Sequence, residues 1–260
     1  MLRAFFTSAT GMRAQELLID NTANNLANVN TTGFKRSHLE FADLIYDVSK
    51  LPGAPTSEGQ TSPIGLQIGN GVRPVGTTNV FSQGVLTQDG VETHVAIEGD
   101  GFFRVTLPDG SPGYTRDGSF NRNGEGQIVN GDGRLIDPNI TIPLGAEQVT
   151  ISATGEVSYL ENGLSTAAGQ IELYRFANPN GLRQLGGNTY AATEASGTEI
   201  AGTAGSLGFG TLRQGFLEGS NVQVVSEMVS LITAQRAYEI NSRAIRAGDE
   251  MLSNTAQIVR

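Results

Sequence analysis

The 260-residue chain contains no cysteine and no tryptophan. Without cysteine there is no disulfide framework, no thiolate nucleophile and no metal site with cysteine ligands. This absence is typical of proteins that never meet an oxidative folding machinery, but it does not fix the compartment. A chain of this length can form one large domain or two small ones. Its hydrophobic fraction of 38% is sufficient for a folded core.

The chain also lacks the features of membrane-spanning and nucleic-acid-binding proteins. No apolar run reaches the ~18 residues of a bilayer-spanning helix. The formal net charge of −9 argues against broad electrostatic capture of nucleic acid or of an anionic membrane. The apolar core of a signal peptide is missing, because polar Thr7, Ser8 and Thr10 closely follow Phe6. If the protein leaves the cytoplasm, we expect its N-terminus to stay uncleaved.

Motifs of catalysis and cofactor binding are missing as well. The two histidines, His38 and His94, lie in no nucleophile or metal motif, so we expect a structural role for each. No GxSxG, P-loop or HExxH sequence occurs. The segments Gly69–Gly71 and Gly208–Gly210 lack the strand-to-helix context of a dinucleotide loop and are interpreted as turns. The sequence therefore predicts no enzyme activity, no catalytic residue, no cofactor and no metal.

One segment has the spacing of an EF-hand calcium loop. Its loop positions 1, 3, 5 and 12 would be occupied by Asn121, Asn123, Glu125 and Asp132, with Gly126 at position 6. However, the first ligand is Asn, the last is Asp rather than Glu, and the flanks resemble strands rather than helices. A tight β-hairpin explains the same residues and is the favoured interpretation.

Both ends of the chain have the periodicity of long helices. From Leu2 to about Asn30, apolar or small residues recur in steps of three and four, and only Glu16 breaks this heptad pattern. Gly33 follows and can terminate the helix. At the other end Ser220–Gln223 is typical of a capping box, and an apolar residue then recurs at every seventh position. The predicted assembly-interface residues are Leu2, Phe5, Met12, Ile19 and Leu26, together with Val224, Leu231, Tyr238, Ile245, Leu252 and Val259.

The C-terminal helix has a second apolar series roughly opposite the first. Its members are Val222, Val229, Ile240, Met251 and Ile258. A helix that is apolar on two opposed faces must be buried on both. The N-terminal helix can cover one face. Because the helix is so long, we expect a neighbouring subunit to cover the other.

Between the helices, the pattern changes to short strands and turns. The segments His94–Ile97, Gly101–Val105 and Gly169–Tyr174 cluster or alternate apolar residues, and Gly, Asn, Asp and Pro separate them. The stretch from Lys50 to Gly76 is rich in Pro, Gly, Ser and Thr and predicts an extended arm or a long loop.

We therefore predict an α+β fold in four parts. Residues 1–32 form the N-terminal helix of an assembly domain, 33–76 an extended Pro/Gly-rich arm, 77–216 a central all-β domain, and 217–260 the C-terminal helix of the assembly domain. The matching heptads indicate that both ends meet in one discontinuous, coiled-coil-like domain. The alternative is that each helix packs separately on the β domain, and periodicity favours neither.

Several segments resemble a known family. Ala23–Arg36 resembles the N-terminal signature of flagellar rod and hook proteins, and Val222–Asn241 resembles their C-terminal signature. Ile97–Phe103 and Tyr114–Gly118 are similar to the β domain of that family. The resemblance covers nearly the whole chain. Its N-terminal motif residues are Ala23, Asn24, Asn25, Leu26, Asn28, Gly33 and Phe34.

Within this family, Gly65–Val75 and Leu212–Val222 are most similar to the distal-rod members. The stretch before Gly65 resembles the insertion that distinguishes the stiff rod from the flexible hook. The resemblance implies a non-enzymatic subunit that polymerises through its terminal helices into a hollow shaft transmitting torque to the hook. The alternatives are a proximal rod or hook subunit, or a secreted adhesin or enzyme with oligomerisation helices.

The resemblance also implies partners and a location. The partners would be further copies of the chain, proximal rod proteins, the hook protein, the surrounding basal-body rings and the flagellar type III export apparatus. The location would be the basal-body rod, which crosses the periplasm, after export without signal cleavage. Neither a nucleic-acid partner nor a membrane span is expected.

Overall fold

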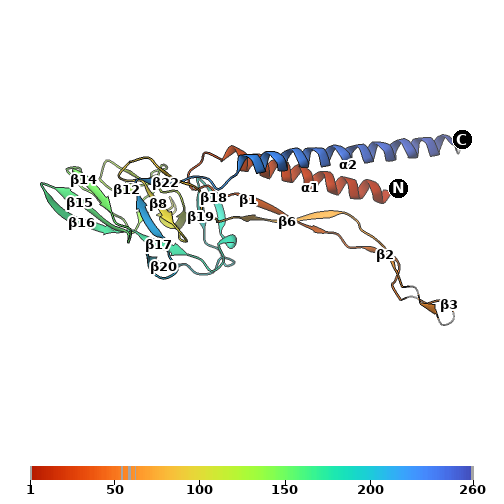
Figure 1. Cartoon of the computed structure of the whole chain (residues 1–260), viewed down its shortest axis with the longest axis horizontal. Helices are drawn as coiled ribbons and strands as arrows, with labels where there is room; N and C mark the ends of the chain where they lie inside the picture. The colour runs from red at the N-terminus through yellow and green to blue at the C-terminus, as the bar shows by residue number, and fades with distance from the viewer. Residues whose placement is uncertain (1, 54, 58–59, 62, 259–260) are drawn as a thin grey trace. The chain divides into compact units, whose positions relative to one another are not determined.

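The computed structural model describes residues 2–53, 55–57, 60–61 and 63–258 (Figure 1). The fold is α+β, with helix α1 (Leu2–Ala27), helix α2 (Val224–Ile258) and a β-rich region between them. The chain divides into two compact units. Unit 1 comprises residues 1–27, 37–78 and 223–260, and unit 2 comprises residues 28–36 and 79–222. Within the described residues, no helix combines the length and apolar character needed to cross a bilayer.

In unit 1, the two helices lie side by side and run antiparallel (Figure 1). The ends of the chain therefore meet each other, as one of the two sequence-based interpretations expected. Unit 1 also contains three antiparallel strand pairs that follow one another outward along the chain. They are β1 (Ser37–Asp43) with β6 (Val72–Asn79), β2 (Asp47–Lys50) with β5 (Leu66–Ile68), and β3 (Pro55–Ser57) with β4 (Gln60–Thr61). We call residues 37–79 the hairpin segment.

The hairpin segment contacts α1 through polar groups. The Asn21 and Asn25 side-chain amides both donate to the Ser37 carbonyl at 2.9 Å. Further along the helix, Thr10 Oγ1 accepts the backbone N–H of Val72 at 3.4 Å. A segment whose sequence predicted an arm or a loop thus has paired strands that are hydrogen-bonded to α1.

Unit 2 consists of many short antiparallel strands. A five-stranded sheet has the order β13-β9-β10-β19-β18, and a three-stranded sheet the order β14-β15-β16. The remaining pairs are β8–β21, β7–β22, β17–β20 and β11–β12. The strands are β7 (Leu86–Gln88), β8 (Val95–Glu98), β9 (Phe103–Thr106), β10 (Pro112–Thr115), β11 (Asn121–Arg122), β12 (Ile128–Val129), β13 (Ile136–Asp137), β14 (Gln148–Ile151), β15 (Glu156–Glu161), β16 (Leu164–Gln170), β17 (Glu172–Arg175), β18 (Arg183–Gly186), β19 (Thr189–Ala191), β20 (Ile200–Thr203), β21 (Thr211–Gln214) and β22 (Phe216–Glu218); a 3-10 turn spans Pro179–Gly181.

Two apolar clusters form the core of unit 2. Phe103 belongs to the larger, mainly aliphatic cluster, and its neighbour Phe102 belongs to an aromatic cluster with Tyr114, Tyr174 and Tyr190. Adjacent residues of an extended chain point to opposite sides, so Phe102 and Phe103 anchor both clusters from one place in the chain. Burial raises the pKa of the Tyr190 phenol to about 12.

Several local predictions for unit 2 are confirmed, and one is wrong. The calcium-like segment is a hairpin in which Asn121 pairs with Val129, and Asn123 Oδ1 accepts the N–H groups of Glu125 and Gln127. Asn162–Gly163 forms the turn between β15 and β16, in agreement with the prediction that Gly and Asn separate the strands. The single strand predicted over Gly169–Tyr174 is wrong, because the chain leaves β16 at Gln170 and starts β17 at Glu172.

The predicted helix start at Ser220 is also wrong. Helix α2 begins at Val224, and its first backbone bond runs from the Glu227 N–H to the Gln223 carbonyl at 3.0 Å. Ser220 Oγ instead accepts the N–H of Val222 at 3.3 Å. Residues 220–223 therefore lead into the helix without forming part of it.

Candidate assembly surface of the terminal helices

The contact between α1 and α2 is made by small and polar side chains. Ala14, Thr22 and Asn25 of α1 are buried, as are Glu227 and Ala234 of α2. These residues place little side-chain bulk between the helix axes. The two helices therefore approach mainly through small and polar groups, and a large side chain, Phe5, packs there against Gly248.

Three contacts fix the register of the antiparallel pair. The Asn25 side-chain amide donates to Glu227 Oε2 at 3.3 Å. A β-carbon placed on Gly11 would lie 3.0 Å from Asn241 Nδ2, and one on Gly248 would lie 2.9 Å from the Phe5 ring. Each step toward the N-terminus of α1 is thus matched by a step toward the C-terminus of α2. A side chain larger than hydrogen does not fit at Gly248 without displacing Phe5.

Sequence reasoning missed this face because it followed apolar residues only. Glu227, Ala234, Asn241 and Gly248 recur every seven residues, three positions after Val224 and its successors. The two series together form a complete heptad stripe, one half of which is small or polar. The signal was therefore present in the spacing, although not in the hydrophobicity.

Of the residues predicted to form the assembly interface, Phe5 packs against Gly248 in this contact, and the others differ in their exposure. Phe5, Met12, Ile19 and Leu26 of α1 and Leu231 and Ile245 of α2 are half-buried. Val224, Tyr238 and Leu252 remain about two-fifths exposed, at 40%, 41% and 38%. The side chain of Leu2 and all of Val259 lie outside the described residues.

A row of large apolar side chains on α2 is open to solvent. Val225 is 76% exposed, Val229 59% and Ile240 64%. Met228, Ile232 and Met251 are also about half exposed. Exposed apolar surface of this kind is typical of an interaction site rather than of a free monomer surface. We call Val225, Met228, Val229, Ile232 and Ile240 the outward row.

The motif around Asn25 forms hydrogen bonds within the chain. Asn25 Nδ2 donates to the Ser37 carbonyl and Asn25 Oδ1 accepts the Ser37 N–H, both at 2.9 Å. This side chain therefore pairs with the first residue of β1 as another strand would. The exposed motif residues are Ala23 and Asn24, the half-buried ones are Leu26, Asn28 and Phe34, and the buried ones are Asn25 and Gly33.

Gly33 is fixed by its backbone conformation. Its φ is +67°, and a β-carbon there would lie 2.6 Å from the backbone nitrogen of Asp117. The preceding Thr32 donates its hydroxyl to Asp117 Oδ1 at 3.0 Å. The glycine thus allows the end of the N-terminal motif to lie directly against residues 116–117 of unit 2.

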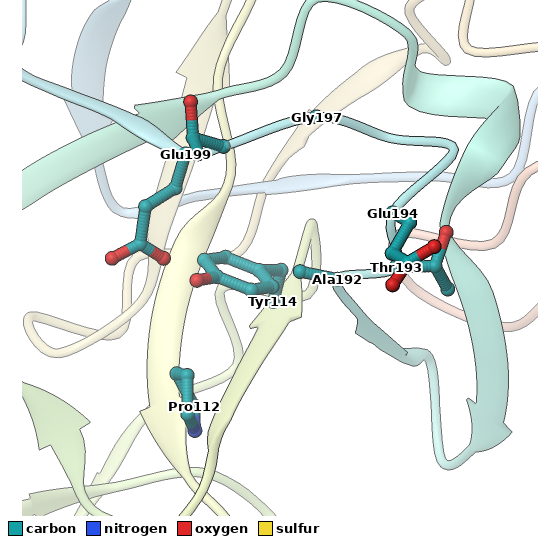
Figure 2. A pocket seen from close by; sticks show the side chains of 8 residues that line it. Pro112, Tyr114, Ala192, Thr193, Glu194, Gly197 and Glu199 are labelled. Carbon is teal, nitrogen blue, oxygen red and sulfur yellow. The ribbon is translucent and has the colours of Figure 1, made fainter.

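Unit 2 also has a hollow of about 830 Å³ (Figure 2). It is lined by Pro112, Tyr114, Ala192, Thr193, Glu194, Gly197, Thr198 and Glu199. Glu199 already pairs with Arg104 at 3.2 Å. Neither a histidine nor a lysine is among these lining residues.

Neither of the two histidines is among the residues that line this hollow. His38 is exposed in β1, and His94 forms a hydrogen-bonded pair with Asp89. Within the residues that the structure describes, no three acidic or histidine side chains gather as metal ligands would.

Three family models match the chain. "Flagella basal body rod protein" matches residues 6–35, "Flagellar hook protein FlgE/F/G D1 domain" residues 96–159, and "Flagellar basal body rod FlgEFG protein C-terminal" residues 213–258. The first and last of these models cover most of α1 and α2.

Relatives match over nearly their whole length. The flagellar basal-body rod protein FlgG of Borreliella burgdorferi is 48% identical over 256 residues, 97% of each chain. The FlgG of Buchnera aphidicola from Acyrthosiphon pisum is 44% identical over 260 residues, 99% of this chain and 100% of its own. The FlgG of Bacillus subtilis is 35% identical over 269 residues, 100% of each chain.

The Gly33 conformation gives a first prediction. Gly110 also has a positive φ, +80°, but a β-carbon added there would have no atom within 4 Å, so Gly110→Ala should cost only about 1 kcal/mol of unfolding free energy. Gly33→Ala adds a backbone clash and should cost about 2–4 kcal/mol. Urea unfolding of both variants measures the difference. Equal losses would contradict the packing argument.

The Asn25 network gives a second prediction. Asn25→Ala leaves the Ser37 N–H and the Glu227 carboxylate without this partner, and should lower the stability of unit 1 by about 2–4 kcal/mol. Amide exchange should rise at Ser37 and along β1. Asp20→Ala, at an exposed position of the same helix, is the control. Unchanged exchange at Ser37 in the Asn25 variant would refute the assigned role.

Proposed function

The chain belongs to the FlgG family of flagellar basal-body rod proteins, and from this we propose that its outward row is the surface through which it polymerises. It is a structural subunit of the distal rod, not an enzyme, and it resides in the flagellar basal body. The observation that carries the proposal is the exposure of five apolar side chains on a helix whose other side already packs on α1.

Two features support this proposal: the apolar area of the outward row, and its position on the side of α2 that faces away from α1. Burial of apolar surface contributes roughly 25 cal/mol per Å², and the outward row follows about four turns of α2. The small and polar contact between α1 and α2 leaves these side chains free to meet another copy. We propose that the helix pair acts as one coiled-coil-like unit, and that such units pack side by side around a central channel.

We propose the rest of the assembly from the same family membership. The polymer forms a hollow drive shaft between proximal rod proteins and the hook protein, inside the basal-body rings, and transmits torque to the hook. The chain reaches this place across the periplasm through the flagellar type III apparatus without cleavage of its N-terminus. Similarity to FlgG over the full length favours the distal rod over a proximal rod or hook subunit.

The outward row is tested by a charge placed within it. Val229→Asp puts a carboxylate on a surface that each contact between copies would bury, and should raise the critical concentration for rod formation at least about tenfold. Electron microscopy and sedimentation of concentrated protein measure this. Circular dichroism of the dilute variant should match that of the wild type, because Val229 is 59% exposed in the single chain.

A matched control introduces the same negative charge at a different position on α2. Asn254→Asp adds the same charge at an exposed position near the C-terminal end of α2, outside the outward row. This variant should assemble with little change. Rods formed by Val229→Asp at the wild-type critical concentration would contradict the proposal.

The hairpin segment supports a separate mechanical proposal. A paired ladder between neighbouring copies would resist sliding, so deletion of residues 49–65 should give a more bendable or polymorphic shaft, or block assembly. A Gly/Ser linker of the same length in place of residues 49–65 separates length from structure. The bending of rods in electron micrographs is the measurement. Straight rods of unchanged stiffness from both variants would rule out this role.

A further inference from the structure

The chain passes between its two units four times, after residues 27, 36, 78 and 222. Residues 28–36 of unit 2 follow directly on α1, and residues 218–222 of unit 2 lead directly into α2. These two stretches are the roots of the terminal helices. They are far apart in sequence, and their contacts within unit 2 decide whether the helix ends start close together.

The two roots are hydrogen-bonded to each other. The Gly33 N–H donates to the Glu218 carbonyl at 2.8 Å, and the Asn221 N–H donates to the Phe34 carbonyl at 3.4 Å. The Arg36 N–H donates to Asn221 Oδ1 at 2.7 Å. The root of α1 is therefore joined to the root of α2 at three successive points.

Asn221 also bonds to a third segment next to a boundary between the units, residues 80–82. Its side-chain amide donates to the carbonyls of Val80 at 2.7 Å and Ser82 at 3.1 Å. The Val80 N–H in turn donates to the Arg36 carbonyl at 2.8 Å. The Asn221 side chain is thus hydrogen-bonded to residues beside two of the four boundaries between the units, and Asn221 itself lies beside a third.

A buried ion cluster lies behind these bonds. Lys35 Nζ donates to Glu218 Oε1 at 2.5 Å and to the Ser82 carbonyl at 2.9 Å, and both side chains of the ion pair are fully buried. Glu218 Oε1 also accepts the Gly84 N–H at 2.9 Å, and Arg116 lies 3.5 Å from Glu218 Oε2. Burial lowers the pKa of the Lys35 ammonium, and the adjacent Glu218 carboxylate opposes this shift.

Such a cluster is poorly explained as a source of stability alone. Burying an ion costs several kcal/mol of desolvation, and well-packed apolar residues often replace a buried ion pair without loss of stability. Charged hydrogen bonds do, however, impose one geometry on the groups that they join. Here those groups are the two helix roots and the chain around Ser82.

We propose that this clasp, formed by residues 33–36, 80–84, Arg116 and 218–221, joins the roots of α1 and α2 so that their pairing becomes a local event. In a chain with no folded connection at all, the segment between the helices is a loop of about 200 residues. With the clasp, the effective connection from Ala27 to Val224 is about a dozen residues, through the Gly33–Glu218 bond. Loop-closure entropy then sets an upper limit of roughly sixty-fold on the gain in the effective concentration of one helix for the other.

The clasp also accounts for where the helix register begins. The contact between Asn25 and Glu227 lies less than three turns from either root. A short, fixed connection brings this polar pair together first, and the contacts at Gly11 and Gly248 follow along the helices. Lys35, Glu218 and Asn221 are thus positioning residues for the helix pair, although none of them belongs to either helix.

The absence of cysteine permits a direct test in the full-length chain. Gly11→Cys with Asn241→Cys places two thiols at a close contact of the helices, and the rate of disulfide formation in dilute protein reports how often they pair. Asn221→Ala should lower this rate several-fold, and Glu218→Gln with Asn221→Ala should lower it further, to a value still short of the sixty-fold limit because the backbone bond from Gly33 to Glu218 remains. Asn178→Ala is the control, because it removes a side-chain amide bond to Ala195 elsewhere in unit 2.

Amide exchange on β9 and β10 shows whether unit 2 stays folded in each variant. The proposal requires slower disulfide formation while these strands remain protected. It is overturned if the Asn221→Ala rate equals that of the control. It is also overturned if Asn221→Ala unfolds β9 and β10, since the residue would then serve the fold of unit 2 rather than the pairing of the helices.

Discussion

The close antiparallel contact between α1 and α2 is the constraint on which the assembly surface depends. The contact is narrow because Gly11, Ala14, Ala234 and Gly248 put almost no side chain between the helices. Apart from Phe5, which packs on Gly248, the bulky residues lie on the flanks or on the opposite side of α2. The exposure of the outward row follows from how the helices pair within one chain.

Polar groups in this contact give it a single register. A purely apolar seam between two long helices tolerates a shift by one heptad, whereas a buried Asn or Glu tolerates only the partner that satisfies it. Asn25 meets both Glu227 and the backbone of Ser37, so one side chain aligns α2 and the start of β1 on α1. The asparagine-rich motif thus specifies geometry, which explains why it is rich in poor helix formers.

Much of the fold could be predicted from periodicity. The steps of three and four gave two long helices, and short apolar runs with Asn-Gly turns gave a β-rich centre. The face that α2 turns to α1 could not be found this way, because Glu227, Ala234, Asn241 and Gly248 have no common hydrophobicity. The start of α2 was misplaced because Ser220 has the chemistry of a helix cap but lies beside Asn221, whose bonds to Arg36 and Val80 hold it outside the helix. Contacts between residues 183 positions apart, as in the Lys35–Glu218 pair, leave no local signal.

The two sides of α2 differ in the kind of force that they provide, and the net charge explains why. Each copy carries a formal charge of −9, so copies repel one another over about a Debye length, ~8 Å at physiological salt. Hydrogen bonds and ion pairs between copies would have to form against that field and would weaken as charges are screened. Burial of the outward row is non-directional and nearly independent of charge, so it can supply association between like-charged subunits. The directional bonds described above lie within the chain, in the contact between the helices and in the clasp. There they fix the shape of the apolar surface through which copies of the chain then associate.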